Sequence, residues 1–270
     1  MIITFPIAIA LIGFLLYVPL AIATEEPGKP YGSQLPHPEL YQDSALFDIQ
    51  AQIYQAFVQS ISGADLQAIE SLEDRLDRLY QTEPQNLVRY WQGYLQYYKA
   101  IYWLKDENEK QGKNAIMEAI DLLESIEGKN SEDYAMLALA ESLSIQFQSG
   151  IKAPIISARV KKYAERAVSL DPENLRAYYV LASNDFYTPE QYGGMQTAEG
   201  HLLKAISLPK QPVSNPFLPS WGKDDAYVML MQFYLKKDRR EEAMATYREA
   251  AAAFPGNYRI MQMASFILSE

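Results

Sequence analysis

Residues 184–206, NDFYTPEQYGGMQTAEGHLLKAI, combine the residue types that could do chemistry: paired glycines, aromatic rings, two glutamates and a histidine. Their spacing fits no phosphate-binding or metal-binding motif. The glycines lack the Gly-Lys-Ser/Thr ending of a phosphate loop, and His201 belongs to no His-Glu-x-x-His pattern. Glu199, only two residues earlier, would lie on another face of the same helix. We therefore expect His201 to be a structural or solvated residue.

The composition of the chain excludes further classes of site. With no cysteine and only two histidines in 270 residues, thiolate zinc sites, disulfides and cysteine nucleophiles are ruled out. No serine carries the glycine elbow of a serine hydrolase. The net charge of −10 would repel phosphate backbones. We predict a protein that is not an enzyme, has no catalytic residue, cofactor or metal, and does not bind nucleic acid.

The first 23 residues, MIITFPIAIALIGFLLYVPLAIA, are uncharged and almost wholly apolar. We expect this segment to engage a membrane, either as a signal peptide cleaved after the small-x-small site at 21–23 or as an uncleaved N-terminal anchor. In both cases the body is expected outside the cytoplasm, periplasmic or membrane-anchored. Residues 24–40 hold four prolines, two glycines and His37, which predicts an extended linker.

From Leu40 onward the hydrophobic pattern is helical, and no alternating run is long enough to predict a strand. The pattern predicts a series of helices joined by short polar breaks: 41–61, 64–81, 87–105, 112–126, 132–148, 157–170, 174–186, 196–207, 224–237, 240–254 and 257–268. Asp171, followed by a proline and a glutamate, is the predicted cap of the helix over 174–186. The body, 41–270, is therefore expected to be one all-α domain of helical hairpins.

An internal spacing recurs in the body. In 225–257, large and apolar positions of one helix are followed by small, aromatic and proline positions of the next: Tyr227, Leu230, Tyr234, Ala243, Tyr247, Ala250 and Pro255. This spacing resembles the tetratricopeptide repeat (TPR), although Met231 replaces the usual glycine. Looser copies run from Ala167 through Pro172 and from Pro84 to Gly93. The resemblance implies a right-handed α-solenoid of about five hairpins plus a C-terminal helix, with a concave face that commonly binds proteins.

Aromatic residues crowd the stretch 87–103, LVRYWQGYLQYYKAIYW, beyond what one helix face can bury. We expect about half of them to pack between hairpins and the remainder to line the concave groove. In the preferred alignment, the repeat offsets and the rim of an enlarged turn at 188–194 predict these groove residues: Trp91, Leu95, Tyr98, Arg176, Tyr179, Ser183, Tyr187 and Gln232. If the repeat is shifted by one residue, Tyr90, Tyr94 and Tyr97 take the places of the first three.

The stretch 184–206 contains an insertion relative to this spacing. Corresponding repeat positions are 20 residues apart in 178–198, against 16 in 227–243. The extra residues fall in 188–194, TPEQYGG, where two glycines allow positive backbone angles. A structural turn is the favoured interpretation. The narrower functional hypothesis is that Tyr187 and Tyr192 add a contact at the rim of the groove.

These observations predict a non-enzymatic adaptor or scaffold of the cell envelope that binds a protein or peptide through the concave face. Residues 1–23 would hold it at the membrane if they are not cleaved. Two alternatives stay open. One is a small-molecule or lipid-binding subunit of an envelope transport system. The other is an assembly protein that forms homo-oligomers through the apolar edge of the C-terminal helix, which includes Ile260, Met261 and Ile267.

Overall fold

The computed structural model describes residues 45–148, 150–211 and 214–268. The predicted membrane segment 1–23 and the predicted linker 24–40 lie outside these ranges, so both stay predictions. Among the described residues, no helix is long and apolar enough to cross a bilayer.

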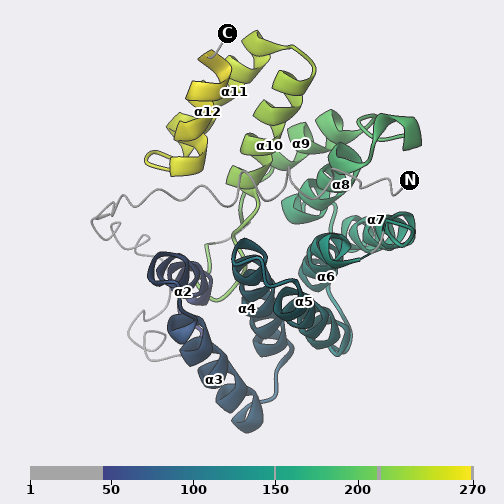
Figure 1. The fold of residues 1–270 in the computed structure, drawn as a ribbon. Coiled ribbons are helices and arrows are strands. Elements are labelled where there is room, and N and C mark those ends of the chain that lie inside the picture. Colours follow the sequence, from purple (N-terminus) through teal and green to yellow (C-terminus); the bar gives the residue numbers. More distant parts are fainter. Residues whose placement is uncertain (1–44, 149, 212–213, 269–270) are drawn as a thin grey trace. The chain divides into compact units, whose positions relative to one another are not determined.

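Helices dominate the described residues, as the hydrophobic periodicity predicted (Figure 1). The α-helices are α2 (Ile49–Gly63), α3 (Gln67–Thr82), α4 (Asn86–Lys105), α5 (Glu109–Glu124), α6 (Ser131–Ser144), α7 (Ala153–Leu170), α8 (Leu175–Tyr187), α9 (Ala198–Ser207), α10 (Lys223–Lys236), α11 (Arg240–Ala253) and α12 (Tyr258–Leu268). Two short 3-10 turns, η2 (Ile145–Phe147) and η3 (Glu190–Tyr192), follow α6 and α8.

Local capping chemistry sets the helix ends that differ from the prediction. Among the described residues of the predicted helix 41–61, the helix begins only at Ile49, because Asp48 adopts the left-handed conformation (φ 50°) immediately before α2. α8 begins at Leu175 with Asn174 as its cap, not Asp171. The Asn174 side chain accepts hydrogen bonds from two main-chain amides of the first turn.

The chain divides into two compact units. Of the described residues, unit 1 contains 45–128, 143–148, 150–153 and 214–219, and unit 2 contains 129–142, 154–211 and 220–268. Each unit is built from antiparallel helical hairpins, so that the apolar face of one hairpin is covered by the next.

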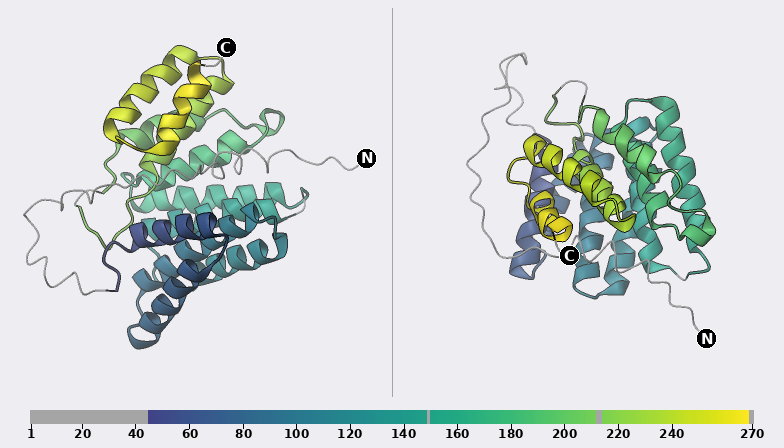
Figure 2. Two further views of the ribbon diagram at one scale, coloured as in Figure 1. Left: turned by 60° about the vertical axis from the view of Figure 1, so that its left-hand side comes forward. Right: turned by 90° about the horizontal axis from the view of Figure 1, so that it is seen from above.

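Unit 1 contains the hairpins α2–α3 and α4–α5 (Figure 2). α4 also packs against α2 and α3. Large apolar side chains fill the core, among them Ile53, Ile69 and Trp91. Gly93 lets α4 approach α5 closely, because a Cβ at this position would lie 2.6 Å from the Cγ of Leu123.

Unit 2 contains α7, most of α6, the hairpins α8–α9 and α10–α11, and α12, which packs against α10 and α11. Alanines without exposed surface let these helices approach closely: Ala177, Ala182, Ala198, Ala205, Ala243 and Ala250. A chain of hydrogen bonds joins the start of α8 to α6 and α7. Asn174 donates to Ser131 Oγ over 2.8 Å, and this hydroxyl donates to the carbonyl of Ala167 over 2.9 Å.

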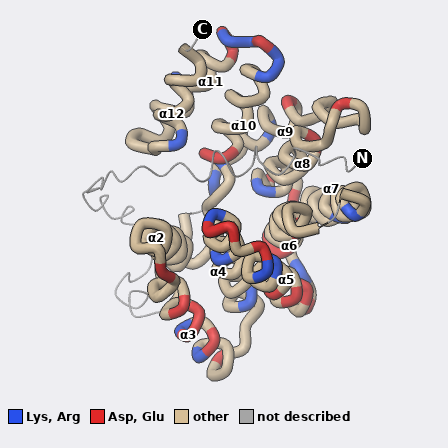
Figure 3. Tube along the Cα trace, in the orientation of Figure 1, with Lys and Arg blue, Asp and Glu red and all other residues tan. Residues whose placement is uncertain are grey.

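Charged residues of both signs are interspersed along α3 and α5 of unit 1 (Figure 3). Some of them tie the hairpins together. Glu73 of α3 accepts a hydrogen bond of 2.6 Å from Gln96 and an ion pair of 2.7 Å from Lys99, both on α4. The charges on this part of α3 therefore support helix packing as well as solvation.

Candidate functional site

The insertion between α8 and α9 folds into a compact turn. η3 is followed by Gly193, whose φ of 87° needs the conformational freedom of glycine. Gly194 is required for another reason: a Cβ there would lie 1.8 Å from the carbonyl oxygen of Thr188. The prediction that both glycines serve positive backbone angles is therefore correct for Gly193 alone, because Gly194 is not among the residues with positive φ.

Asp185 anchors this turn to the end of α8. Its carboxylate accepts hydrogen bonds of 2.8 Å from the amides of Thr197 and Ala198, at the start of α9. Its carbonyl accepts a third, of 3.0 Å, from the amide of Met195. A carboxylate at a helix N-terminus also interacts favourably with the helix dipole. The enlarged turn is thus held in one conformation.

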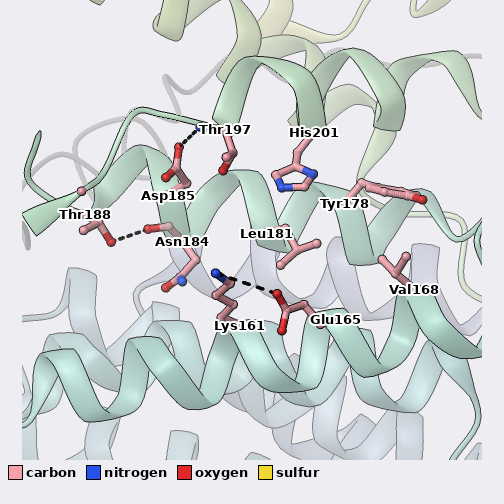
Figure 4. Close-up of a pocket in the computed structure, with 11 residues that line it drawn as sticks. Lys161, Glu165, Val168, Tyr178, Leu181, Asn184, Asp185, Thr188, Thr197 and His201 are labelled. Carbon is pink, nitrogen blue, oxygen red and sulfur yellow. Dashed lines mark hydrogen bonds and ion pairs between the residues drawn. The ribbon is translucent and has the colours of Figure 1, made fainter.

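The turn closes one end of a pocket that lies between α7 and α9 over α8 (Figure 4). This α7–α9 pocket has a volume of about 450 Å³, a size that is usual for small-molecule sites. It is lined by Lys161, Glu165, Val168, Tyr178, Leu181, Asn184, Asp185, Thr188, Gly193, Thr197 and His201. Six of these residues come from the stretch 184–206.

The two ends of the α7–α9 pocket differ in chemistry. At one end the rings of Tyr178 and His201 lie 6.2 Å apart and tilted by 34°, beside the apolar Leu181. At the other end lie an amide group, a carboxylate and the hydroxyl of Thr188. Burial lowers the pKa of His201, so its imidazole is neutral at pH 7 and can donate one hydrogen bond and accept another. The pocket therefore suits a ligand with a flat apolar part and a polar edge.

The predicted groove residues of unit 1 are largely covered. Trp91 and Leu95 are buried, and Tyr98 is half-buried. The indole of Trp91 donates a hydrogen bond of 3.0 Å to the carbonyl of Phe217, which lies in the segment between α9 and α10. The chain's own residues therefore contact Trp91 on this side.

In unit 2, Arg176 and Ser183 are buried, whereas Tyr179, Tyr187 and Gln232 are half-buried. The guanidinium of Arg176 forms a two-pronged ion pair with Glu132. It also donates hydrogen bonds to the carbonyls of Lys210 (3.0 Å) and Trp221 (3.3 Å). All of these partners belong to the same chain, so Arg176 links α6, α8 and the segment between α9 and α10.

Arg259 on α12 is a residue that the sequence reasoning missed. It forms an ion pair with Asp225 of α10. Burial raises the pKa of Tyr187 to about 12, and the positive charge of nearby Arg259 opposes this shift. Arg259 also interacts electrostatically with Tyr179. Arg259 thus lies with both tyrosines on one face of unit 2, and among the described residues its Nε–H has no hydrogen-bond acceptor.

A repeated local pattern could have identified Arg259. Asn174 caps α8 two residues before Arg176, and Asn257 stands two residues before Arg259 and accepts a hydrogen bond from the amide of Ile260. The two arginines therefore occupy equivalent places in their helices. Among the described residues, no group of three or more His, Asp or Glu side chains is placed to hold a metal ion.

The paired helices, their order and the repeat spacing define a helical-repeat protein with a fold of the TPR type, as the sequence predicted. A solved structure with a similar fold is the HusA haemophore from Porphyromonas gingivalis, with 21% identity, a TM-score of 0.59, and coverage of 75% of this chain and 96% of that chain. Another is TTC0263, a thermophilic TPR protein of Thermus thermophilus, with 16% identity, a TM-score of 0.55, and coverage of 82% and 100%.

One family model matches part of the sequence. It is described as the C-terminal domain of the HTH-type transcriptional regulator Rgg and matches residues 47–136, about a third of the chain. A search of the curated proteins finds no match. At these identities, the likeness to the two solved structures concerns the fold.

Proposed function

We propose that the protein is a non-catalytic scaffold that binds a segment of a partner protein on the face formed by α8, α10 and α12. We call it the α8–α10–α12 face. The observation that carries this proposal is the Nε–H of Arg259, which is buried and has no acceptor among the described residues. A buried donor without an acceptor costs free energy, and binding that turned the Arg259 side chain toward a carbonyl or carboxylate of a partner would remove that cost.

The neighbours of Arg259 suit a peptide segment. Tyr179 and Tyr187 are half-buried, so each offers an amphipathic ring at low conformational cost. Gln232 on α10 adds an amide that can pair with a peptide main chain. We infer a partner segment with an apolar or aromatic side chain next to a carbonyl or carboxylate acceptor. The TPR-type fold supports protein binding as the general kind of function.

The place of action is a further part of the proposal. The apolar, uncharged sequence of 1–23 supports an exported scaffold of the cell envelope, either cleaved or anchored in the membrane. α12 also exposes the apolar side chains of Met261, Phe266 and Leu268, which supports self-association through this helix. Sedimentation of the purified protein over a range of concentrations would test self-association, and a monomer at every concentration would contradict it.

Capture of partners from membrane-extracted cells tests the scaffold function. We expect the double variant Tyr179→Ala/Tyr187→Ala to keep the wild-type circular dichroism spectrum and to lose the partner that the wild-type protein retains. Leu203→Ala is the control, because Leu203 is 44% exposed and lies on α9, outside the α8–α10–α12 face. If the double variant retains the same partners as the wild-type protein, the assignment of the α8–α10–α12 face is wrong.

A second candidate function is the binding of a small, flat molecule in the α7–α9 pocket. The specific observation is a pocket of about 450 Å³ in which a neutral His201 lies beside the Tyr178 ring. The similar HusA structure is that of a haemophore, so haem is the first ligand to test. We expect a saturable shift of the haem absorption band that His201→Ala abolishes and His37→Ala leaves unchanged. A shift that is insensitive to both variants would indicate non-specific adsorption.

A further inference from the structure

The segment between α9 and α10 does not stay in one unit. Residues 214–219, SNPFLP, which we call the strap, belong to unit 1, whereas the described residues on either side belong to unit 2. In Figure 1 this green segment runs beside α2 and α4. A plain connection between two neighbouring hairpins needs only a few residues. The strap therefore makes contacts that a connection alone does not require.

The strap lies against aromatic residues of unit 1. The carbonyl of Phe217 accepts the hydrogen bond from Trp91 Nε1, at 3.0 Å. The ring of Phe217 packs edge-on against Phe47, with centroids 6.1 Å apart. Within the strap, Asn215 Oδ1 accepts a hydrogen bond of 2.9 Å from the Phe217 amide, which forms an Asx turn. The Asx turn thus positions the ring and the main-chain carbonyl of Phe217 against the helices of unit 1.

Trp91 is also the first of a row of aromatic rings that are buried or half-buried in unit 1. From Trp91 it continues through Tyr94, Tyr98 and Phe57, with centroids 5.4, 5.1 and 5.0 Å apart in turn. We call these four residues, together with Phe47, the aromatic cradle. Trp91 and Tyr98 are two of the positions that the repeat offsets place on the binding groove, and the strap contacts Trp91. The strap therefore contacts one of the residues at which the repeat pattern predicts a ligand.

We propose that the strap occupies the binding site of a segment of a partner protein. This partner segment is extended, carries an aromatic residue flanked by prolines, and displaces the strap from the aromatic cradle. The proposal rests on the proposed function, because it assumes that such helix faces bind partner segments. It adds a second face, on unit 1, and the chemistry of what that face accepts.

Three properties of the strap support displacement by such a segment. Prolines 216 and 219 flank Phe217 and restrict the unbound chain, which lowers the entropic cost of binding to an aromatic surface. The indole N–H of Trp91 needs an acceptor when it is buried, and any peptide carbonyl can serve. Leu218 is 44% exposed, so a partner segment with a better-placed apolar residue would bury more surface than the strap does.

Binding of a peptide to the full-length protein tests the proposal. The probe is a fluorescein-labelled peptide with the sequence SNPFLPS, measured by fluorescence anisotropy. The strap competes with the probe in the wild-type protein, so we expect Phe217→Ala to bind it about tenfold more tightly. Asn215→Ala loosens the strap without changing its aromatic residue and should bind about fivefold more tightly. Leu203→Ala, an exposed apolar residue of α9, is the control and should behave as the wild type.

Two further measurements make the result decisive. Adding Trp91→Phe to either strap variant removes the indole donor and should weaken the probe again, and a probe with serine in place of phenylalanine should not bind. Equal affinity of the wild-type protein and both strap variants, or no binding by any of them, would overturn the proposal. The proposed function would survive that outcome if the Tyr179→Ala/Tyr187→Ala variant still loses its partner, so the two failures are distinguishable.

Discussion

Replacing Gly194 by alanine tests how the enlarged turn is held. The added Cβ would lie 1.8 Å from the carbonyl oxygen of Thr188 and 2.9 Å from that of Asp185. Both neighbours are main-chain atoms at the end of α8, so no side-chain rotation can relieve the overlap. The turn has to move away from α8, and the hydrogen bonds that join them are lost.

The loss of stability expected for Gly194→Ala follows from those hydrogen bonds. The amide of Met195 donates to Asp185 O over 3.0 Å, and the amides of Thr197 and Ala198 donate to the Asp185 carboxylate over 2.8 Å. At about 1 kcal/mol for each of these three hydrogen bonds, we expect Gly194→Ala to lower the free energy of unfolding by about 3 kcal/mol.

Two other glycines of the same stretch provide matched controls. Gly193→Ala places a Cβ in open space but at a φ of 87°, which costs about 1 kcal/mol. Gly200→Ala places a Cβ in open space within α9 and should stabilise the protein by up to about 1 kcal/mol. Urea unfolding followed by circular dichroism gives the order of the midpoints. A Gly194→Ala variant that is at least as stable as Gly193→Ala would refute the reasoning.

Three further changes should alter stability in predictable directions. Arg176→Met leaves the Glu132 carboxylate without its partner and should lower the free energy of unfolding by about 3 kcal/mol in urea titrations. Burial, and after it the charge of Asp225, raise the pKa of Asp224, so stability falls as pH rises through that raised value. Asp224→Asn should therefore stabilise the protein at pH 7 and make its stability depend less on pH. Burial lowers the pKa of His201, so stability is lost as pH falls from about 6.5 through the lowered value, and an NMR titration of the imidazole should show this directly.

The fold was predictable because its determinants are local. Apolar periodicity identified the helices, and the offsets of residues such as Tyr227, Ala243 and Pro255 identified the hairpin repeat. Helix ends were less predictable, since they depend on single side chains. Asn174 caps α8 although Asp171 has an equally suitable side chain, and Asp171 instead accepts a hydrogen bond from the amide of Glu173.

The α7–α9 pocket was only partly predictable. Sequence spacing located the insertion in 188–194 and predicted a structural turn. It did not predict that the turn closes a pocket, because Val168 and Lys161 reach the pocket from α7 through the packing of separate helices. The role of Gly194 was hidden for the same reason. Its requirement comes from the main chain of Thr188 across the turn and not from its own backbone angles.

The aromatic residues of α4 show what the repeat offsets cannot predict. The offsets assign Trp91 to a helix face, but they cannot show what lies against that face. The contact comes from Phe217, 126 residues away in the sequence, in a segment that has no counterpart in the repeat pattern. A long-range contact of this kind depends on loop placement, for which single-sequence patterns carry no signal.

The comparison of Arg176 with Arg259 explains why equivalent residues can have different roles. Both follow a capping asparagine by two residues, and both pair with an acidic residue of another helix. Arg176 pairs with Glu132 through Nε and Nη2, and its Nη1 donates to two carbonyls of the segment between α9 and α10. Arg259 pairs with Asp225 through Nη1, and no described residue supplies an acceptor to its Nε. A partner carbonyl or carboxylate beside Tyr179 and Tyr187 would give the Nε–H of Arg259 the acceptor that Glu132 gives the Nε–H of Arg176, so binding would complete an arrangement that the repeat already contains.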